Sequence, residues 1–324
     1  AERLFAQMGV KELHTVSSQR APDPDFPGLP EPNPEKPEAV NALLKLAREE
    51  SADIALAHDP DADRLAVAIT TPDGGFRLLT GDETGALLAD FLLAHWSDPR
   101  PPITLSTLVS SHLLARISEQ RGAHWEATLT GFKWLAARAS ELEAKGLGQL
   151  CFAYEEAIGF SSGRVVRDKD GLEAAALFLD LCTALRREGS DPYARLEALQ
   201  RCHGLYRTRA LSWSCPGEEG RERITTAMAT MRTGHLQALG PLQVARVIDQ
   251  RKQPEATDMV RLELQPEGYL ALRPSGTEPK LKAYLEVRTD MAPDESLVLA
   301  ESRADVLLDQ LEGALRDLLG LDNP

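Results

Sequence analysis

The sequence contains no apolar run of the roughly 18 residues that a membrane-spanning helix needs. It does not begin with the charged and then apolar stretch of a signal peptide. Its four cysteines form no CxxC pair and have no histidine at zinc-finger spacing, so we expect reduced thiols and a cytoplasmic location. The net charge of −14 argues against a broad surface for nucleic acid or lipid, and we expect neither as a partner.

Three common active-site patterns are also missing. The sequence contains none of the motifs GxGxxG, GxxxxGK[ST] and HExxH. An acidic protein without these motifs that binds an anion must use a local basic cluster or a bound metal ion.

The length of 324 residues is sufficient for two or three domains. Helix and strand patterns alternate up to about His203, and strands dominate beyond it. We predict the α/β fold class, with two mixed-sheet α/β domains followed by a smaller α+β domain. The predicted boundaries are 1–80, 81–203 and 204–324.

The first predicted domain opens on a helix that ends at Gly9, followed by a strand over Glu12–Val16. Residues 21–37 hold many prolines and predict a surface loop. Asn33 and Pro34 are typical of an N-cap and first helical residue, which predicts a helix from there to about Glu50. The apolar runs 52–57 and 65–69 predict strands buried on both faces, as in a parallel sheet.

The remaining two domains follow the same kind of pattern. The sequence pattern of the second domain predicts alternating helices and strands. The helices are expected over 81–93, 111–120, 133–145 and 171–187, and the strands over 103–110, 124–129 and 149–153. The third predicts a mostly antiparallel sheet with two helices: strands over 207–213, 244–249, 260–264, 270–272 and 281–287, and helices over 218–231 and from 295 onward. In the last strand, apolar residues alternate with polar ones, which predicts one core face and one polar face.

Three aspartates follow the first of the buried strand patterns, in the stretch "HDPDADR". Asp59, Asp61 and Asp63 are hard oxygen ligands of the kind that Mg²⁺ and Ca²⁺ prefer. An EF-hand needs Gly at position six and Glu at position twelve of its loop, but Arg64 and Thr70 stand there. A Mg²⁺ site with room for a phosphate oxygen fits better, with Arg64 able to steady that phosphate. The alternative is a solvated acidic turn.

The stretch "RPSGTEPKLK" lies between two predicted strands of the third domain. Ser275, Gly276 and Thr277 offer hydroxyls and accessible backbone N–H groups, while Arg273 and Lys282 supply positive charge. These features predict a phosphate-binding loop. A simple Pro/Gly turn explains the same letters equally well.

Three further stretches of the second domain carry charged residues beside predicted strands or helices. In "YEEAIGF", Glu155 and its neighbour can accept hydrogen bonds from sugar hydroxyls, and an exposed loop is the alternative. In "VRDKDG", Lys169 can reach an anion or move a proton, although ion pairs on the surface are the commoner use of such residues. In "TLTGFKW", Lys133 follows a turn.

The five stretches occur together, in this order and at this spacing, and this combination closely resembles the α-D-phosphohexomutases, the phosphoglucomutase/phosphomannomutase family. The pairing of "FKW" with "EEAIG" is most similar to the branch with phosphopentomutase and glucose-1,6-bisphosphate synthase relatives. The resemblance covers essentially the whole chain. It implies a phosphosugar mutase fold whose three domains correspond to the second, third and fourth of the family's four.

The resemblance also implies roles for the candidate residues. The resemblance implies that Asp59, Asp61 and Asp63 hold Mg²⁺ with help from Arg64. It also implies that Lys169 corresponds to a lysine proposed for proton transfer. Glu155 is expected to bind sugar hydroxyls, with Lys133 in a loop that faces the sugar or its phosphate. The phosphate that is not transferred is expected to lie against the third-domain residues: Arg273, Ser275, Gly276, Thr277 and Lys282.

The sequence departs from the family at three points. Ala157 stands where many members have serine, and Lys282 where many have arginine, which loses the two-pronged hydrogen bond. No stretch resembles "TASHNP", the family's phosphoserine loop. We therefore expect the chain to be part of a longer mutase, or a truncated product, and to be inactive alone.

Three interpretations follow from the sequence. The first is a phosphosugar mutase that moves a phosphoryl group between the 1 and 6 (or 5) positions of a sugar phosphate through a bisphosphate. The second is a non-catalytic protein that binds Mg²⁺ and a sugar phosphate. The third is an acidic α/β protein whose loops are only turns. For the first two the expected partner is a small sugar phosphate, and the expected oligomeric state is a monomer or a dimer.

Overall fold

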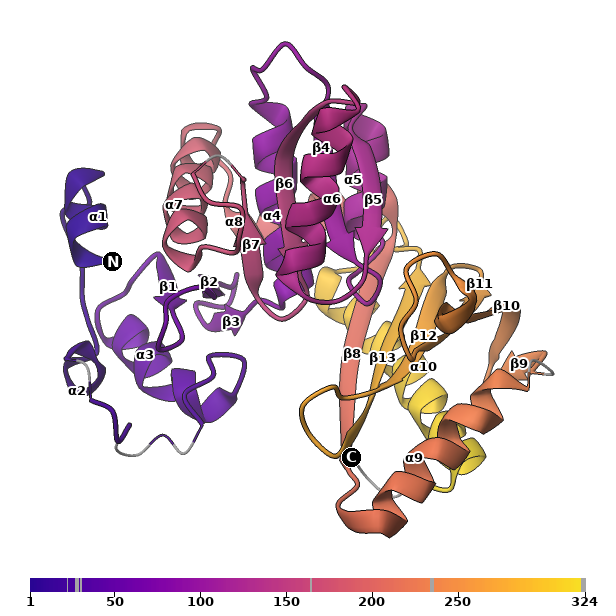
Figure 1. Cartoon of the computed structure of the whole chain (residues 1–324). Coiled ribbons are helices and arrows are strands. Elements are labelled where there is room, and N and C mark those ends of the chain that lie inside the picture. The colour runs from indigo at the N-terminus through magenta and orange to yellow at the C-terminus, as the bar shows by residue number, and fades with distance from the viewer. Residues whose placement is uncertain (22, 27–28, 30, 164, 234–235, 322–324) are drawn as a thin grey trace. The chain divides into compact units, whose positions relative to one another are not determined.

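A computed structural model describes all residues except 22, 27–28, 30, 164, 234–235 and 322–324 (Figure 1). The chain forms two compact units, residues 1–199 and 200–324, which are considered separately below. The predicted α/β fold class is confirmed, since both units combine sheets with covering helices. Among the described helices, none is long and apolar enough to cross a bilayer.

The first part of the first unit is a small antiparallel sheet with helices before it. The strands, in the order β1-β2-β3, are β1 (Ile54–Ala57), β2 (Ala66–Thr70) and β3 (Phe76–Leu78). The helices are α1 (Glu2–Gln7), α2 (Ser17–Arg20) and α3 (Pro37–Glu49). Ala47 of α3 packs against Ala55 and Ala68 of the sheet, which forms a small core. The loop between β1 and β2 carries the three aspartates.

Two secondary-structure predictions for this region are wrong. Residues Glu12–Val16 form no strand. Helix α3 begins at Pro37 with Lys36 as its N-cap, and not at Asn33. In a helix capped by Asn33, Pro37 would have to donate the first backbone hydrogen bond, and proline has no N–H. Asn33 instead accepts a turn hydrogen bond from the Lys36 N–H.

The predicted parallel pairing of the strands is also wrong, because β1 and β2 are antiparallel, with Ala55 opposite Ala68. A short loop joins them, whereas a parallel pair needs a long crossover. Strand β1 is buried only at Ala55. The described residues of the predicted surface loop at 21–37 form no helix or strand before Pro37, where α3 begins. Residues 22, 27–28 and 30 of this loop lie outside the described part of the chain.

The second part of the first unit is a four-stranded mixed sheet in the order β5-β4-β6-β7. Three strands are parallel, β4 (Pro102–Thr107), β5 (His124–Thr128) and β6 (Gln149–Glu155), and β7 (Gly159–Ser161) is antiparallel to β6. The helices are α4 (Gly81–Ala94), α5 (Leu113–Arg121), α6 (Phe132–Ala144), α7 (Gly171–Arg187) and α8 (Pro192–His203). The predicted alternation is confirmed, whereas β7 and α8 were not predicted.

The parallel strands place three loops at one edge of this sheet. The buried side chains of Ile103, Leu105 and Leu150 fill the core beneath helix α6. Carboxyl ends of parallel strands meet at the same edge, where α/β proteins usually bind ligands. The stretch "TGFKW" spans the loop after β5 and the first turn of α6, and the turn after β6 contains "EEAIG". Both candidate sugar-binding stretches therefore lie at the same edge of the sheet, with β4 between their strands.

The second unit, 200–324, is a six-stranded antiparallel sheet in the order β8-β13-β12-β11-β10-β9, as predicted for an α+β unit. Its strands are β8 (Leu205–Ser214), β9 (Ala238–Leu239), β10 (Leu242–Asp249), β11 (Val260–Gln265), β12 (Gly268–Pro274) and β13 (Lys280–Thr289). Its helices are α9 (Gly217–Arg232), the 3₁₀ turn η1 (Gln250–Lys252) and α10 (Leu297–Leu319).

The predicted core face of β13 is confirmed, because Leu281, Ala283, Leu285 and Val287 are all buried. The prediction that its other face is polar and open fails at Glu286, which is fully buried. Strand β13 lies between β8 and β12, so it has no free edge.

Gly85 provides a test of the packing between α4 and β6. A methyl group at this position would lie 2.9 Å from the ring of Tyr154, which is itself buried. We expect Gly85→Ala to destabilise the protein by about 1–3 kcal/mol, as overpacking of a core does. Gly313 in α10 has no atom within 4 Å of such a methyl group, so Gly313→Ala should stabilise by about 0.5–1 kcal/mol. Urea denaturation measures both changes. Equal signs for the two variants would contradict the packing argument.

Candidate functional site

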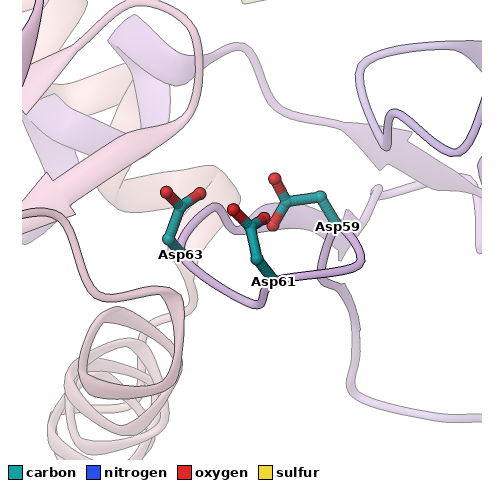
Figure 2. Close-up of side chains that lie close together, drawn as sticks. All are labelled: Asp59, Asp61 and Asp63. Carbon is teal, nitrogen blue, oxygen red and sulfur yellow. The ribbon is translucent and has the colours of Figure 1, made fainter. Parts of the chain in front are cut away.

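The three aspartates lie on the loop that follows β1 (Figure 2). One carboxylate oxygen from each lies within 4.8 Å of the others. Asp59 is buried, Asp63 is half-buried and Asp61 is exposed. Figure 2 shows the three carboxylates on the same side of the loop, with those of Asp59 and Asp61 adjacent. Three oxygen ligands from one short loop suit a hard divalent cation.

The charge of this cluster is only partly compensated by the protein. Arg64 donates to Asp59 from both its backbone N–H and its guanidinium Nε. Burial alone would raise the pKa of Asp59, but the hydrogen bonds from Arg64 outweigh burial and lower it. The pKa of Asp61 is raised, mainly because its carboxyl group is hydrogen-bonded to that of Asp59. The cluster thus still favours added positive charge, which is the condition for binding a cation.

Lys169 comes from the turn before α7 and reaches the same cluster. Its Nζ lies 2.8 Å from Oδ2 of Asp63. Partial burial favours the neutral amine, but the ion pair with Asp63 outweighs burial and raises the pKa of Lys169. In this arrangement Lys169 therefore holds its proton. The structure brings together the metal-loop and proton-transfer candidates that the sequence separates by about a hundred residues.

Glu155 ends strand β6 and lies close to the same lysine. Its Oε1 accepts a hydrogen bond of 2.7 Å from the N–H of Gly131, in the "TGFKW" loop. Burial raises the pKa of Glu155, while the Gly131 N–H and the charge of Lys169 act in the opposite direction. The side chain of Lys169 passes over Gly159, next to Oε2 of Glu155. Glu155, Lys169 and Asp63 are therefore neighbours in space.

Backbone contacts join the metal loop to these neighbouring loops. The Leu65 N–H donates to the Ile158 carbonyl at 3.0 Å, and Arg64 forms a single antiparallel bridge with Gly159. The Gly171 N–H donates to the Ala62 carbonyl at 3.2 Å. A methyl group at Gly171 would lie only 2.4 Å from the Arg64 carbonyl oxygen, so this contact requires glycine.

Lys133 is placed less specifically. It is exposed near the start of α6, and its Nζ lies 5.5 Å from the centre of the Trp134 ring. The neighbouring Gly131 contacts Glu155, so the loop itself adjoins the site. A direct ligand contact by Lys133 stays a prediction.

The candidate phosphate loop of the second unit is a hairpin between β12 and β13. Arg273 lies opposite Lys282 in the strand register, and the Ser275 N–H donates to the Lys280 carbonyl at 2.8 Å. Arg273 and Ser275 are half-buried, while Gly276 and Thr277 at the tip are exposed. The Arg273 guanidinium lies 5.9 Å from the centre of the Tyr284 ring. The hairpin thus holds two cations at its base and an open tip, and its role stays a prediction.

Two features of the first unit escaped the sequence analysis. The Gly131 N–H is the donor that holds Glu155. Glu156, beside it, is not directed to the same point, since its Oε2 accepts hydrogen bonds from Thr107 and Ser110. The glycine of "TGF" and the doubled glutamate of "YEEA" are visible in the sequence, but nothing in the pattern predicts that Glu155 and Glu156 have different hydrogen-bond partners.

Comparison with known families gives two matches on this chain. The profile described as phosphoglucomutase/phosphomannomutase, alpha/beta/alpha domain II, matches residues 1–74. The profile for alpha/beta/alpha domain III of the same family matches residues 80–201. The two matches follow one another without overlap and cover the metal loop and the sugar-binding candidates.

Curated relatives agree with these matches. A protein named probable phosphomannomutase from Haemophilus influenzae is 34% identical over 300 residues, which is 92% of this chain and 59% of that protein. Phosphopentomutase from Homo sapiens is 34% identical over 307 residues, or 87% of this chain and 50% of that protein. The chain thus spans about half the length of the curated relatives it matches.

Solved structures share the fold. A phosphoglucomutase from Paramecium (pp63/parafusin) aligns over 94% of this chain and 53% of its own, with a TM-score of 0.67 and 18% identity. A phosphoglucomutase/phosphomannomutase family protein from Burkholderia thailandensis aligns over 93% and 55%, with a TM-score of 0.62 and 21% identity. At these identities the likeness establishes the fold alone.

The aspartate cluster predicts a measurable response to a divalent cation. We expect Mg²⁺ to raise the thermal midpoint, because it binds only the folded loop. Asp61→Asn removes one charged ligand, and we expect it to weaken Mg²⁺ binding by at least about tenfold, or about 1.4 kcal/mol. Asp73→Asn is the matched control, because Asp73 lies in the turn between β2 and β3 and accepts its hydrogen bonds from Thr71 and Gly75. Equal calorimetric affinities for both variants would rule out this metal site.

Proposed function

Because the chain belongs to the phosphoglucomutase/phosphomannomutase family, we propose that it serves a phosphosugar mutase, an intramolecular phosphotransferase. The proposed reaction moves a phosphoryl group between the 1 and 6 (or 5) positions of a sugar phosphate. Residues 1–80 would supply the metal site, 81–203 the sugar site and 204–324 a phosphate site. Curated relatives named phosphomannomutase, phosphoglucomutase and phosphopentomutase support this reaction class.

One observation supports the proposal most strongly: the ion pair between Lys169 and Asp63, with Glu155 beside it. A phosphoryl transfer to a sugar hydroxyl needs three things at one place: a group that manages the hydroxyl proton, a positive charge for the phosphoryl oxygens and acceptors for the sugar. Lys169, the metal loop and Glu155 fit these three roles. A set of unrelated surface turns would have no reason to converge.

Asp59, Asp61 and Asp63 are the residues that we propose hold Mg²⁺. Their oxygen donors and the raised pKa of Asp61 fit a hard cation. When bound, the ion would neutralise charge on the phosphoryl group in transfer. Arg64 is oriented by Asp59 on one side, and its Nη1 lies 3.4 Å from Asn33. Its guanidinium is thus aimed beside the metal loop, where it can steady a phosphate oxygen.

The proposed exchange has two steps. A phosphoserine would donate its phosphoryl group to a hydroxyl of the sugar monophosphate, giving a sugar bisphosphate. After the bisphosphate reorients, its other phosphate would return to the serine. The 324 residues contain no stretch resembling the family's phosphoserine loop, and we propose that the donor is not among them.

For the second unit we propose a phosphate-binding role centred on the β12–β13 hairpin. Arg273 and Lys282 supply charge at the base, and Ser275, Gly276 and Thr277 supply hydroxyls and backbone N–H groups nearer the tip. Gly276 has ordinary backbone angles and no neighbour within 4 Å of an added methyl group. Neither packing nor conformation therefore explains the glycine, whereas close approach of a ligand would.

The second candidate function is binding of Mg²⁺ and a sugar phosphate without turnover by this chain. The missing phosphoserine loop favours it over catalysis by the 324 residues alone. In either case we propose a small sugar phosphate as partner, a cytoplasmic location, and a monomer or dimer.

Sugar phosphate binding should depend on Glu155. With Mg²⁺ present, we expect glucose 1-phosphate to bind the chain and Glu155→Gln to weaken that affinity by about tenfold or more, since a hydrogen bond to a charged group contributes about 1.5–3 kcal/mol. Glu119→Gln is the control, because Glu119 is exposed on α5 and pairs with Arg116. Isothermal titration calorimetry measures both. If Glu155→Gln and Glu119→Gln bind equally well, Glu155 is not a sugar ligand.

The chain alone should not interconvert sugar phosphates. We expect the pure 324-residue protein to show no conversion of glucose 1-phosphate to glucose 6-phosphate above background in a coupled assay. The physical reason is that the sequence supplies no phosphoserine loop to donate the phosphoryl group. Turnover that survives purification and disappears in Asp61→Asn would show that this chain carries its own phosphoryl donor.

A further inference from the structure

Glu156 is a titratable group that the proposed reaction does not use. Its Oε2 accepts hydrogen bonds from the hydroxyls of Thr107, at 2.8 Å, and Ser110, at 3.2 Å. Both donors lie at the end of strand β4, and Glu156 itself follows β6. The carboxyl group therefore joins the turn after β6 to the end of the neighbouring strand β4.

The turn that Glu156 holds, residues 155–159, is the meeting point of the site loops. Glu155 accepts from Gly131, the Ile158 carbonyl accepts from Leu65, and Gly159 forms the bridge to Arg64. Any shift of this turn would move the sugar-binding carboxylate and the support of the metal loop together.

The backbone of the turn is strained. Ile158 has a φ of 54°, in the left-handed region that β-branched residues rarely adopt. Such a conformation is energetically unfavourable and persists only where surrounding contacts fix it. The hydrogen bonds to Glu156 are among the contacts that hold the turn in this conformation.

Glu156 faces other acids. Asp82 at the start of α4 and Glu155 on the same turn both act on it electrostatically. Asp82 is in turn held by the Tyr154 hydroxyl and the Ser111 N–H, while Lys169 faces Glu155. Removal from solvent and the charges of Asp82 and Glu155 together raise the pKa of Glu156 to about 7. Near neutral pH the group therefore changes from a neutral carboxyl to a carboxylate facing two others.

We propose that Glu156 is a positioning residue, which in its neutral form anchors the 155–159 turn and so directs Glu155 and the metal loop. Its part in ligand binding rests on the sugar phosphate function proposed above. Above neutral pH the ionised group repels Asp82 and Glu155, and the turn loosens. The folded-state pKa is higher than the ordinary value of 4.5, so the contribution of Glu156 to stability is full below about pH 4.5 and is lost as the pH rises through about 7.

Amide exchange tests the anchor without any ligand. The reporters are the N–H groups of Gly131 and Leu65, which bond to Glu155 and Ile158. In the wild type we expect their protection factors, corrected for intrinsic exchange, to fall on the order of tenfold between about pH 6 and about pH 8. Glu156→Gln keeps a neutral side chain at every pH and should abolish most of that fall. Glu119→Gln should keep the fall of the wild type. An equal fall in Glu156→Gln and wild type would overturn the proposal.

A second variant covers the case in which Glu156→Gln does not fold. Thr107→Val removes one hydroxyl that donates to Glu156, which favours the protonated carboxyl further. We expect the midpoint of the protection change to move to higher pH in this variant. An unchanged midpoint would overturn the proposal.

Ligand binding distinguishes this proposal from the proposed function. If the wild type binds glucose 1-phosphate, its affinity should weaken from about pH 6 to about pH 8 more steeply than that of Glu156→Gln. If the affinities of the wild type and of Glu156→Gln change equally with pH, Glu156 does not direct Glu155 for binding, and the proposal is overturned. If the wild type binds no sugar phosphate at any pH, the proposed function fails, while the amide exchange still decides whether Glu156 anchors the turn.

Discussion

The crowding of three carboxylates on one short loop is the constraint from which the arrangement of the first unit follows. Arg64 compensates Asp59 from within the loop, and Lys169 compensates Asp63 from the turn before α7. Asp61 is exposed and hydrogen-bonded to another acid, which raises its pKa. Two protein cations therefore leave a deficit of positive charge at the centre of the cluster. A divalent cation would fill that deficit, and part of the compensation already comes from a distant part of the chain.

Lys169 links the aspartate cluster to the loops proposed to bind the sugar. Glu155 lies beside Lys169 and accepts a hydrogen bond from the Gly131 N–H. The ends of β5 and β6 bring Gly131 and Glu155 to one edge of the sheet. Lys169 thus forms an ion pair with Asp63 and also acts electrostatically on Glu155. We expect a change of charge at either carboxylate to alter the interaction of Lys169 with the other.

The sequence predicts elements well where the pattern is long, as for α7, whose predicted and observed bounds agree at Gly171 and Arg187. It fails at α3, where Asn33 and Pro34 match the local start signal but Pro37 excludes that start, because Pro37 cannot donate the first backbone hydrogen bond. The aspartate cluster was predictable because its members are close in sequence, and its three oxygens do gather. The directions of the Glu155 and Glu156 side chains could not be predicted. The two residues are identical and adjacent, and only the fold determines that Gly131 donates to one and Thr107 to the other.

Backbone strain explains how short loops achieve these contacts. Ala62 and Ile158 are both left-handed, with φ of 56° and 54°, and neither is glycine. In each case the carbonyl of the strained residue accepts the hydrogen bond that joins two loops: Ala62 from Gly171, and Ile158 from Leu65. A left-handed residue reverses the direction of the chain, so its carbonyl can face a neighbouring loop instead of its own strand. Two of the four described non-glycine residues with positive φ thus connect the metal loop to the turns bearing Lys169 and Glu155, and the other two are Phe26 and Ser51. Strain at connecting residues of this kind tends to persist in functional sites.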